Sequence, residues 1–188
     1  VRVRLTDQPR GRGAVPVQFR LTDHRDLAAG VERVRRLLDA DADPVAIASH
    51  LEPDPIIGPL VRRWPGLRVP GHVDGAELAV RALLGQQITV AAARTVASRL
   101  AEWFGMALPV ELAEPGLTRL FPTAVDLADL GPEDLPMPRA RSRALRALSC
   151  ALADGVVRLD RSQPRDEVRS ALVAILGVGP WTADYIAM

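Results

Sequence analysis

The stretch AILGVGPWTADY, residues 174–185, determines how the second half of this chain is organised. An apolar pattern with helical spacing runs into it from Glu167, stops at Gly177 and begins again at Pro180. Glycine is common just after the end of a helix, and proline at the first position of the next one. The pattern therefore predicts a hairpin of two helices, the second reaching Met188, joined by a Gly-Val-Gly turn.

The two glycines of this turn leave its backbone without side-chain cover. The first N–H groups of a helix have no partner within the helix, and the helix dipole favours an anion there. A phosphate of a nucleic-acid duplex can therefore lie against such a turn. The alternative is an ordinary corner between two packed helices, in which the glycines serve only the turn.

The residues on either side make the pattern more specific, because apolar residues precede the turn and Trp-Thr-Ala-Asp-Tyr (181–185) follows it. Together they resemble the helix-hairpin-helix motif of the DNA glycosylases. From about residue 60 to residue 188 the chain is most similar to the alkylation-repair branch, DNA-3-methyladenine glycosylase II. The resemblance implies that the DNA backbone is bound by Gly177, Val178, Gly179 and Thr182.

Composition restricts the class of protein. The chain has 188 residues, 48% of them hydrophobic, and lacks an apolar run of 18 residues, so we expect a globular protein that does not enter a membrane. No signal segment is recognisable, and the expected location is the cytoplasm, at the nucleoid of a bacterium. The net charge of +1 does not by itself predict nucleic-acid binding, which needs a local basic face.

The resemblance and the pattern together predict an α+β fold with two domains. Residues 1–21 alternate between apolar and polar side chains, which predicts two strands joined by a turn at 9–13. A helix of about sixteen residues capped by Asp23 and two short helices follow. The Pro- and Gly-rich segment 64–71 marks the boundary. We expect an N-terminal sheet-and-helix domain over 1–66, incomplete at its start, and an all-α helix-hairpin-helix domain over 67–188, incomplete at its end.

The second domain carries clear helix start and stop signals. Asp74 with Glu77 predicts a capping box, and Thr89 predicts the cap of a long helix that ends at Phe104. Further helices are expected from Thr123 and from the prolines at 138 and 164. The helix from 138 carries Arg139, Arg141, Arg143 and Arg146. These arginines form either a solvated face or contacts to phosphates.

Between two of these helices lies Gly85-Gln86-Gln87. The amides can simply cap the turn. In the glycosylases that the chain resembles, a residue at this position fills the gap left by an expelled nucleotide, because the enzyme must rotate the base out of the duplex. By position this wedge is Gln87. The best-known alkylation enzymes have leucine there, whereas a glutamine can also hydrogen-bond the orphaned base.

Two aromatic residues, Trp181 and Tyr185, stand four positions apart and share one face of the helix after the turn. They are either core residues or one wall of a base pocket, to which Phe121 is added by loose analogy. N-alkylated purines carry positive charge, which aromatic faces attract. Such a pocket favours alkylated bases without reading a hydrogen-bond code.

The chain contains no lysine, so all 24 of its Lys and Arg residues are arginines. Glycosylases that also cut the backbone attack the sugar with a lysine amine. Lysine-bearing relatives place that residue where this chain has Trp181. We therefore expect a monofunctional enzyme that uses water as nucleophile. The resemblance places its catalytic aspartate about twenty residues past the hairpin, beyond Met188. The chain should thus be a fragment that binds DNA without turnover.

The cysteine and histidine residues give little support for metal binding or redox chemistry. Cys150 is alone and the three histidines lack ligand spacing, so we expect no disulfide, iron–sulfur cluster or zinc site and no cofactor. The resemblance implies one exception, a monovalent cation held by main-chain carbonyls of the hairpin. Its ligands would be Val173, Leu176 and Val178.

Three functions remain open. The first is a base-excision repair glycosylase, acting as a monomer on duplex DNA with an alkylated base. Among Arg-rich relatives, the resemblance also implies possible fusion to an adaptive-response methyltransferase domain. The second is a non-catalytic helix-hairpin-helix module that only binds DNA, and the third is a structural α-helical protein. Only the first requires a base pocket beside Trp181.

Overall fold

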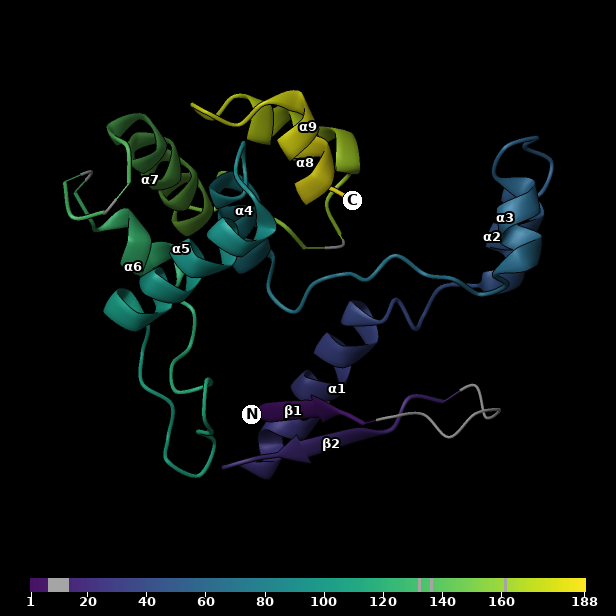
Figure 1. The fold of residues 1–188 in the computed structure, drawn as a ribbon, viewed down its shortest axis with the longest axis horizontal. Coiled ribbons are helices and arrows are strands. Elements are labelled where there is room, and N and C mark those ends of the chain that lie inside the picture. The colour runs from purple at the N-terminus through teal and green to yellow at the C-terminus, as the bar shows by residue number, and fades with distance from the viewer. Residues whose placement is uncertain (7–13, 132, 136, 161) are drawn as a thin grey trace. The chain divides into compact units, whose positions relative to one another are not determined.

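The structure, a computed structural model, describes residues 1–6, 14–131, 133–135, 137–160 and 162–188 (Figure 1). Its residues divide into two units, Val1–Val73 and Asp74–Met188. A small sheet followed by helices confirms the predicted α+β class. Among the described residues, no helix has the length and apolar character needed to cross a membrane.

The first unit begins with two antiparallel strands, β1 (Arg2–Leu5) and β2 (Val17–Arg20), as the alternating sequence predicts. The predicted turn at 9–13 lies outside the described residues. The side chain of Asp23 accepts a hydrogen bond from the Arg25 N–H at 2.9 Å and caps a short 3-10 helix, His24–Asp26. Helix α1 (Leu27–Leu37) follows, so the predicted single helix is divided in two.

Helix α1 packs on the sheet through Gly30. A Cβ atom at Gly30 would lie 3.0 Å from Cε1 of Phe19, so a larger residue there would require the ring to move by a few tenths of an ångström. Val34 of this helix is buried, whereas Leu27 and Val31 are 43% and 38% exposed. The described residues therefore cover only part of the apolar side of α1.

The rest of the first unit contains two short helices, α2 (Pro44–Leu51) and α3 (Gly58–Arg63). The segment after them returns to the end of α1, where Gly71 donates its N–H to the Leu37 carbonyl at 2.9 Å. Arg68 also pairs with Asp39. These bonds hold the Pro- and Gly-rich segment in the first unit, which extends to residue 73, whereas the predicted boundary follows residue 66.

The second unit is built of helices with caps that the sequence largely predicts. Thr89 and Thr123 accept hydrogen bonds from the third N–H of their helices. Asp74 does the same, but the carboxylate of Glu77 pairs with Arg81 one turn further on, so the predicted capping box is only half formed. The helices are α4 (Gly75–Leu84), α5 (Val90–Phe104), α6 (Ala124–Ala128), α7 (Arg139–Ala153), α8 (Arg165–Val173) and α9 (Pro180–Ile186).

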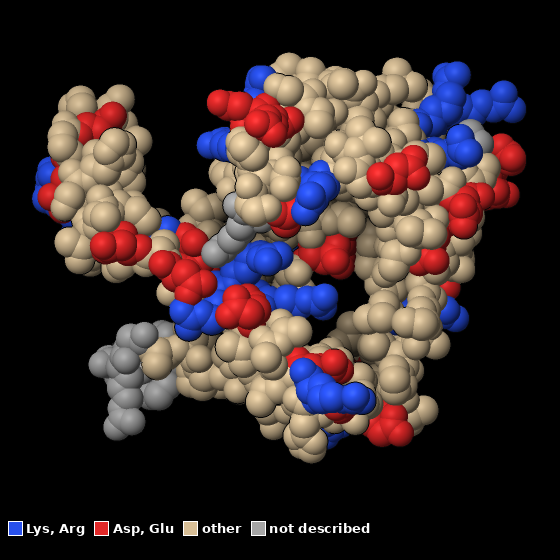
Figure 2. All heavy atoms as spheres, turned by 180° about the vertical axis from the view of Figure 1, so that it is seen from behind, with Lys and Arg blue, Asp and Glu red and all other residues tan. Residues whose placement is uncertain are grey.

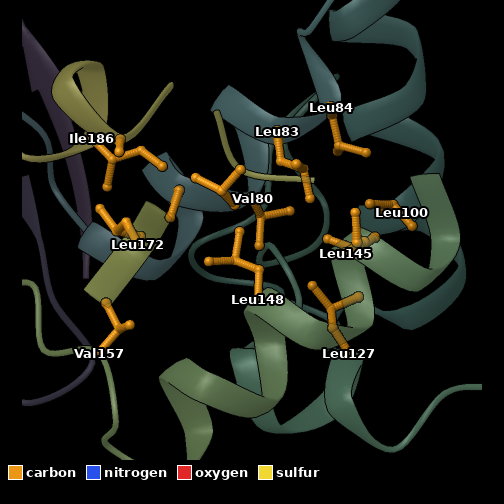
Figure 3. Packing of buried hydrophobic residues seen from close by; sticks show 14 of the residues in the cluster. Val80, Leu83, Leu84, Leu100, Leu127, Leu145, Leu148, Val157, Leu172 and Ile186 are labelled. Carbon is orange, nitrogen blue, oxygen red and sulfur yellow. The ribbon is translucent and has the colours of Figure 1, made fainter. Parts of the chain in front are cut away.

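The core of this unit lies between α4 and α7, and the hairpin of α8 and α9 closes it (Figure 3). Each fully buried leucine or valine stabilises the fold by about 1.5–3 kcal/mol relative to an exposed one. The hairpin therefore has its position fixed by burial. The buried residues labelled in Figure 3 include Val80, Leu83, Leu145, Leu148, Leu172 and Ile186.

Candidate nucleic-acid interface

The hairpin turn is longer than the sequence predicts. Helix α8 ends at Val173, not near Leu176, because the next N–H groups form tighter turns: Ile175 donates to Leu172 at 3.0 Å and Val178 to Ile175 at 3.1 Å. Such i→i−3 bonds often end an α-helix. Gly177 then adopts φ +81°, the left-handed conformation expected of it.

The two glycines of the turn have different surroundings. A Cβ atom at Gly177 would lie 2.5 Å from the Cβ of Ala144 on α7, so this glycine lets the hairpin pack against the core. Gly179 has φ −82°, and a Cβ atom there would meet no heavy atom within 4 Å. The structure therefore requires glycine at 177 but not at 179.

The start of α9 leaves backbone donors available. Pro180 occupies the first helical position, as predicted, and the Ala183 N–H closes the first turn on the Gly179 carbonyl at 3.0 Å. Within the described part of the chain, the N–H groups of Gly179, Trp181 and Thr182 donate none of the hydrogen bonds found. These N–H groups can donate hydrogen bonds to an anion, because no side chain at Gly179 stands in its way.

A glutamine ties this turn to the break between α4 and α5. The Nε2 atom of Gln86 donates to the Thr182 Oγ1 at 2.8 Å and to the Gly177 carbonyl at 3.2 Å. The backbone carbonyl of Gln86 accepts a hydrogen bond from Nη2 of Arg141 at 3.0 Å. Sequence reasoning missed this role, since more than ninety residues separate Gln86 from its hairpin partners.

The predicted wedge, Gln87, is the next residue along the chain. Its side chain is exposed and its φ is +58°, unusual for a residue other than glycine. An exposed residue in a strained conformation is a reason to consider a functional role. Its entry into a duplex stays a prediction.

The predicted aromatic pair is formed and lies at the surface. Trp181 is 72% and Tyr185 42% exposed, and their rings stack with centroids 5.7 Å apart and planes 14° from parallel. The alternative of two core residues is thus wrong. Asp184, between them in sequence, accepts a 2.6 Å hydrogen bond from Nε of Arg169 on α8.

Phe121 has a different environment. Its ring is half-buried against the core, and the guanidinium of Arg81 lies 4.7 Å from the ring centroid. None of the ring contacts of the described residues joins it to Trp181 or Tyr185. Its membership of one pocket with that pair stays a prediction.

The carbonyl groups named for a cation are available. Those of Val173, Leu176 and Val178 accept none of the hydrogen bonds that the described residues make. That these carbonyls hold a cation stays a prediction. Side-chain sites offer no competitor, because no group of three or more His, Cys, Asp or Glu able to hold a metal occurs among the described residues.

The arginines of α7 do not share one environment, and the choice between a solvated face and phosphate contacts stays open. Three of them are exposed, whereas Arg141 is half-buried through its bond to Gln86. On the face seen in Figure 2, basic and acidic side chains are interspersed. The exposed arginines are Arg139, Arg143 and Arg146.

The chain matches known protein sequences over most of its length. Residues 1–74 match the AlkA N-terminal domain family. The chain is 46% identical over 168 residues to the "Probable bifunctional transcriptional activator/DNA repair enzyme AlkA" of Mycobacterium tuberculosis, covering 89% of this chain and 34% of that protein. It is 33% identical over 189 residues to DNA-3-methyladenine glycosylase 2 of Escherichia coli, covering 93% and 62%. The chain thus spans about a third and about three fifths of these two relatives.

Solved structures share the fold at lower identity. An 8-oxoguanine glycosylase/lyase of Clostridium acetobutylicum, in complex with double-stranded DNA, superposes with a TM-score of 0.71 at 19% identity, covering 94% of this chain and 60% of that one. The 3-methyladenine DNA-glycosylase of Archaeoglobus fulgidus gives 0.67 at 18%, covering 92% and 58%. The fold is that of the helix-hairpin-helix DNA glycosylases. In sequence, the chain is similar to the AlkA and DNA-3-methyladenine glycosylase 2 proteins over about nine tenths of its length.

Proposed function

We propose that the chain is the DNA-binding and base-recognising part of a monofunctional DNA N-glycosylase for alkylated purines of the 3-methyladenine type. The observation that carries the proposal is the uncovered start of α9 directly beside two exposed, stacked rings, Trp181 and Tyr185. A single short helix thus offers donors for a phosphate at its start and an aromatic surface for a base beside them.

The hairpin anchors the DNA backbone. The free N–H groups around Gly179 donate to a phosphate, and the absence of a side chain there permits close approach. These contacts carry no sequence information, as suits an enzyme that scans duplex DNA. A monovalent cation bound to the carbonyls of Val173, Leu176 and Val178 would add positive charge beside that phosphate.

Gln87 serves as the wedge. A base must leave the stack before its glycosidic bond can be reached, and the gap must be filled. The exposed amide of Gln87 can fill the space and hydrogen-bond the orphaned base. The rings of Trp181 and Tyr185 then receive the extruded purine, whose positive charge strengthens the contact. Phe121 would line the same pocket.

Hydrolysis needs a further group. Because the chain has no lysine, water is the nucleophile, and an ionised carboxylate must stabilise the oxocarbenium character of the sugar. Asp184 is already paired with Arg169. The family resemblance places the catalytic aspartate beyond Met188, so we expect the 188 residues to bind DNA without turnover.

The partner in this proposal is duplex DNA that contains an alkylated base, bound by a monomer. Fusion to an adaptive-response methyltransferase domain stays a prediction from the family resemblance. The second candidate, a DNA-binding module without catalysis, needs the hairpin but not the rings. The exposure of both rings favours the glycosylase.

The test is a binding measurement on the 188-residue chain. Duplex with an abasic-site analogue should bind more tightly than intact duplex, and both affinities should fall as salt rises, because phosphate contacts release counterions. Equal affinity for the two duplexes would contradict base flipping. Release of 3-methyladenine should occur only with a longer protein, and release by the 188 residues would overturn the account of the aspartate.

A further inference from the structure

The turn that carries the wedge and the hairpin that binds phosphate are joined by one side chain, that of Gln86. Its side-chain amide reaches the carbonyl of Gly177, in the glycine-rich turn, and the hydroxyl of Thr182, in the helix after it. Its backbone carbonyl accepts a hydrogen bond from Arg141 of α7. Three segments distant in sequence therefore meet at the residue before Gln87.

The orientation of this amide follows from chemistry. A carbonyl oxygen only accepts hydrogen bonds, so the NH₂ group of Gln86, not its oxygen, must face Gly177. Thr182 is 3% exposed, and competition from water for its hydroxyl is therefore weak. Both hydrogens of the amide have partners on the hairpin, at 2.8 and 3.2 Å.

We propose that Gln86 is a positioning residue that holds the side chain of Gln87 at a fixed distance and direction from the phosphate bound by the hairpin. The proposal rests on the proposed function, since it assigns a role to Gln86 in that same site. Gln86 itself touches no DNA in this account and acts through Gln87.

The conformation of Gln87 explains why such a tether is needed. With φ at +58°, the residue is held in a region that costs an L-amino acid about 1–2 kcal/mol. A strained turn keeps its conformation only where its neighbours determine it, and the bonds of Gln86 on both sides do so. Released from them, the turn can relax and the wedge can move. Displacements of about 1 Å at a functional site can cost up to a hundredfold.

The experiment replaces Gln86 by methionine, which keeps its length and removes its hydrogen bonds. We expect the preference of the 188-residue chain for abasic-analogue duplex over intact duplex to fall about tenfold. Affinity for intact duplex, which depends on the hairpin, should change by less than about twofold. The matched control is Gln163→Met, since the side chain of Gln163 bonds to its sequence neighbours Ser162 and Asp160 and to no residue of the hairpin among the described hydrogen bonds. Its preference should equal that of the unchanged chain.

A double substitution shows whether Gln86 acts through Gln87. Gln87→Ala should also lose the preference, and Gln86→Met with Gln87→Ala should lose no more than Gln87→Ala alone. Additive losses would overturn the proposal, as would an unchanged preference in Gln86→Met. Parallel losses of stability and of affinity for both duplexes would reduce Gln86 to a structural residue. If the unchanged chain shows no preference, the proposed function itself fails, and that outcome is visible before any substitution is made.

Discussion

The hairpin has an inner side that faces the helical core and an outer side that does not. On the inner side Leu172 and Ala183 are 0% exposed. On the outer side Trp181 is 72% and Leu176 65% exposed. Within one short stretch of chain, fold and proposed function therefore depend on different residues.

This separation determines what substitutions can reveal. A change on the inner side alters the free energy of unfolding, and any effect on DNA binding follows from it. A change on the outer side leaves stability almost intact, so a loss of DNA binding there reports on the interface itself. The predictions below use this difference, beginning with the largest expected effect on stability.

Leu172→Ala should have the largest effect. Its side chain is fully buried in the core, and truncation of a buried leucine to alanine costs about 2–5 kcal/mol through lost burial and the cavity that remains. Denaturant unfolding of the 188-residue chain measures this cost. The matched control, Leu176→Ala on the outer side, should cost less than about 0.5 kcal/mol. Similar losses of unfolding free energy at both positions would contradict the division of the hairpin into a buried and an exposed side.

Gly177→Ala should cost about 2–4 kcal/mol, because alanine at φ +81° is strained and its Cβ would lie 2.5 Å from that of Ala144. Ala144→Gly removes the overlap but not the strain. The double variant should therefore unfold at a smaller cost than the sum of the two single costs. Strict additivity in the same denaturant experiment would show that α7 and the turn do not touch as described.

Trp181→Ala belongs to the outer side and should cost less than about 1.5 kcal/mol, since it loses the stacked contact with Tyr185 and little buried surface. Binding to duplex with an abasic-site analogue and a free cationic purine should weaken, and binding to intact duplex should not. Tyr185→Phe preserves the stack and should change neither affinity. A Trp181→Ala variant with unchanged binding would remove the rings from the proposed pocket.

Much of the fold follows from local signals. Thr89 and Thr123 cap their helices as predicted, Gly177 takes the left-handed conformation, and Pro180 begins α9, because each of these features depends on a few neighbouring residues. The early end of α8 could not be predicted, since apolar side chains continue to residue 176 and only the packing of the turn decides where the helix stops.

The sequence predicted less of the candidate site than of the fold. Stacking of Trp181 on Tyr185 follows from their spacing, but their exposure depends on what the rest of the chain covers. The bonds from Gln86 to the hairpin involve residues far apart in sequence, and no local pattern distinguishes Gln86 from Gln87. Only the tertiary structure shows that Gln86 is hydrogen-bonded to the hairpin.

The most direct test of the account is the affinity of Gly179→Asp for intact duplex DNA. Aspartate is a favourable residue at the start of a helix and nothing lies within 4 Å of its Cβ position, so stability should change by less than about 0.5 kcal/mol. The carboxylate would face the phosphate, and affinity should fall at least about tenfold. The uncharged control, Gly179→Asn, should lose less. A stable Gly179→Asp variant that binds duplex as tightly as the unchanged chain would contradict the claim that this turn holds the DNA backbone.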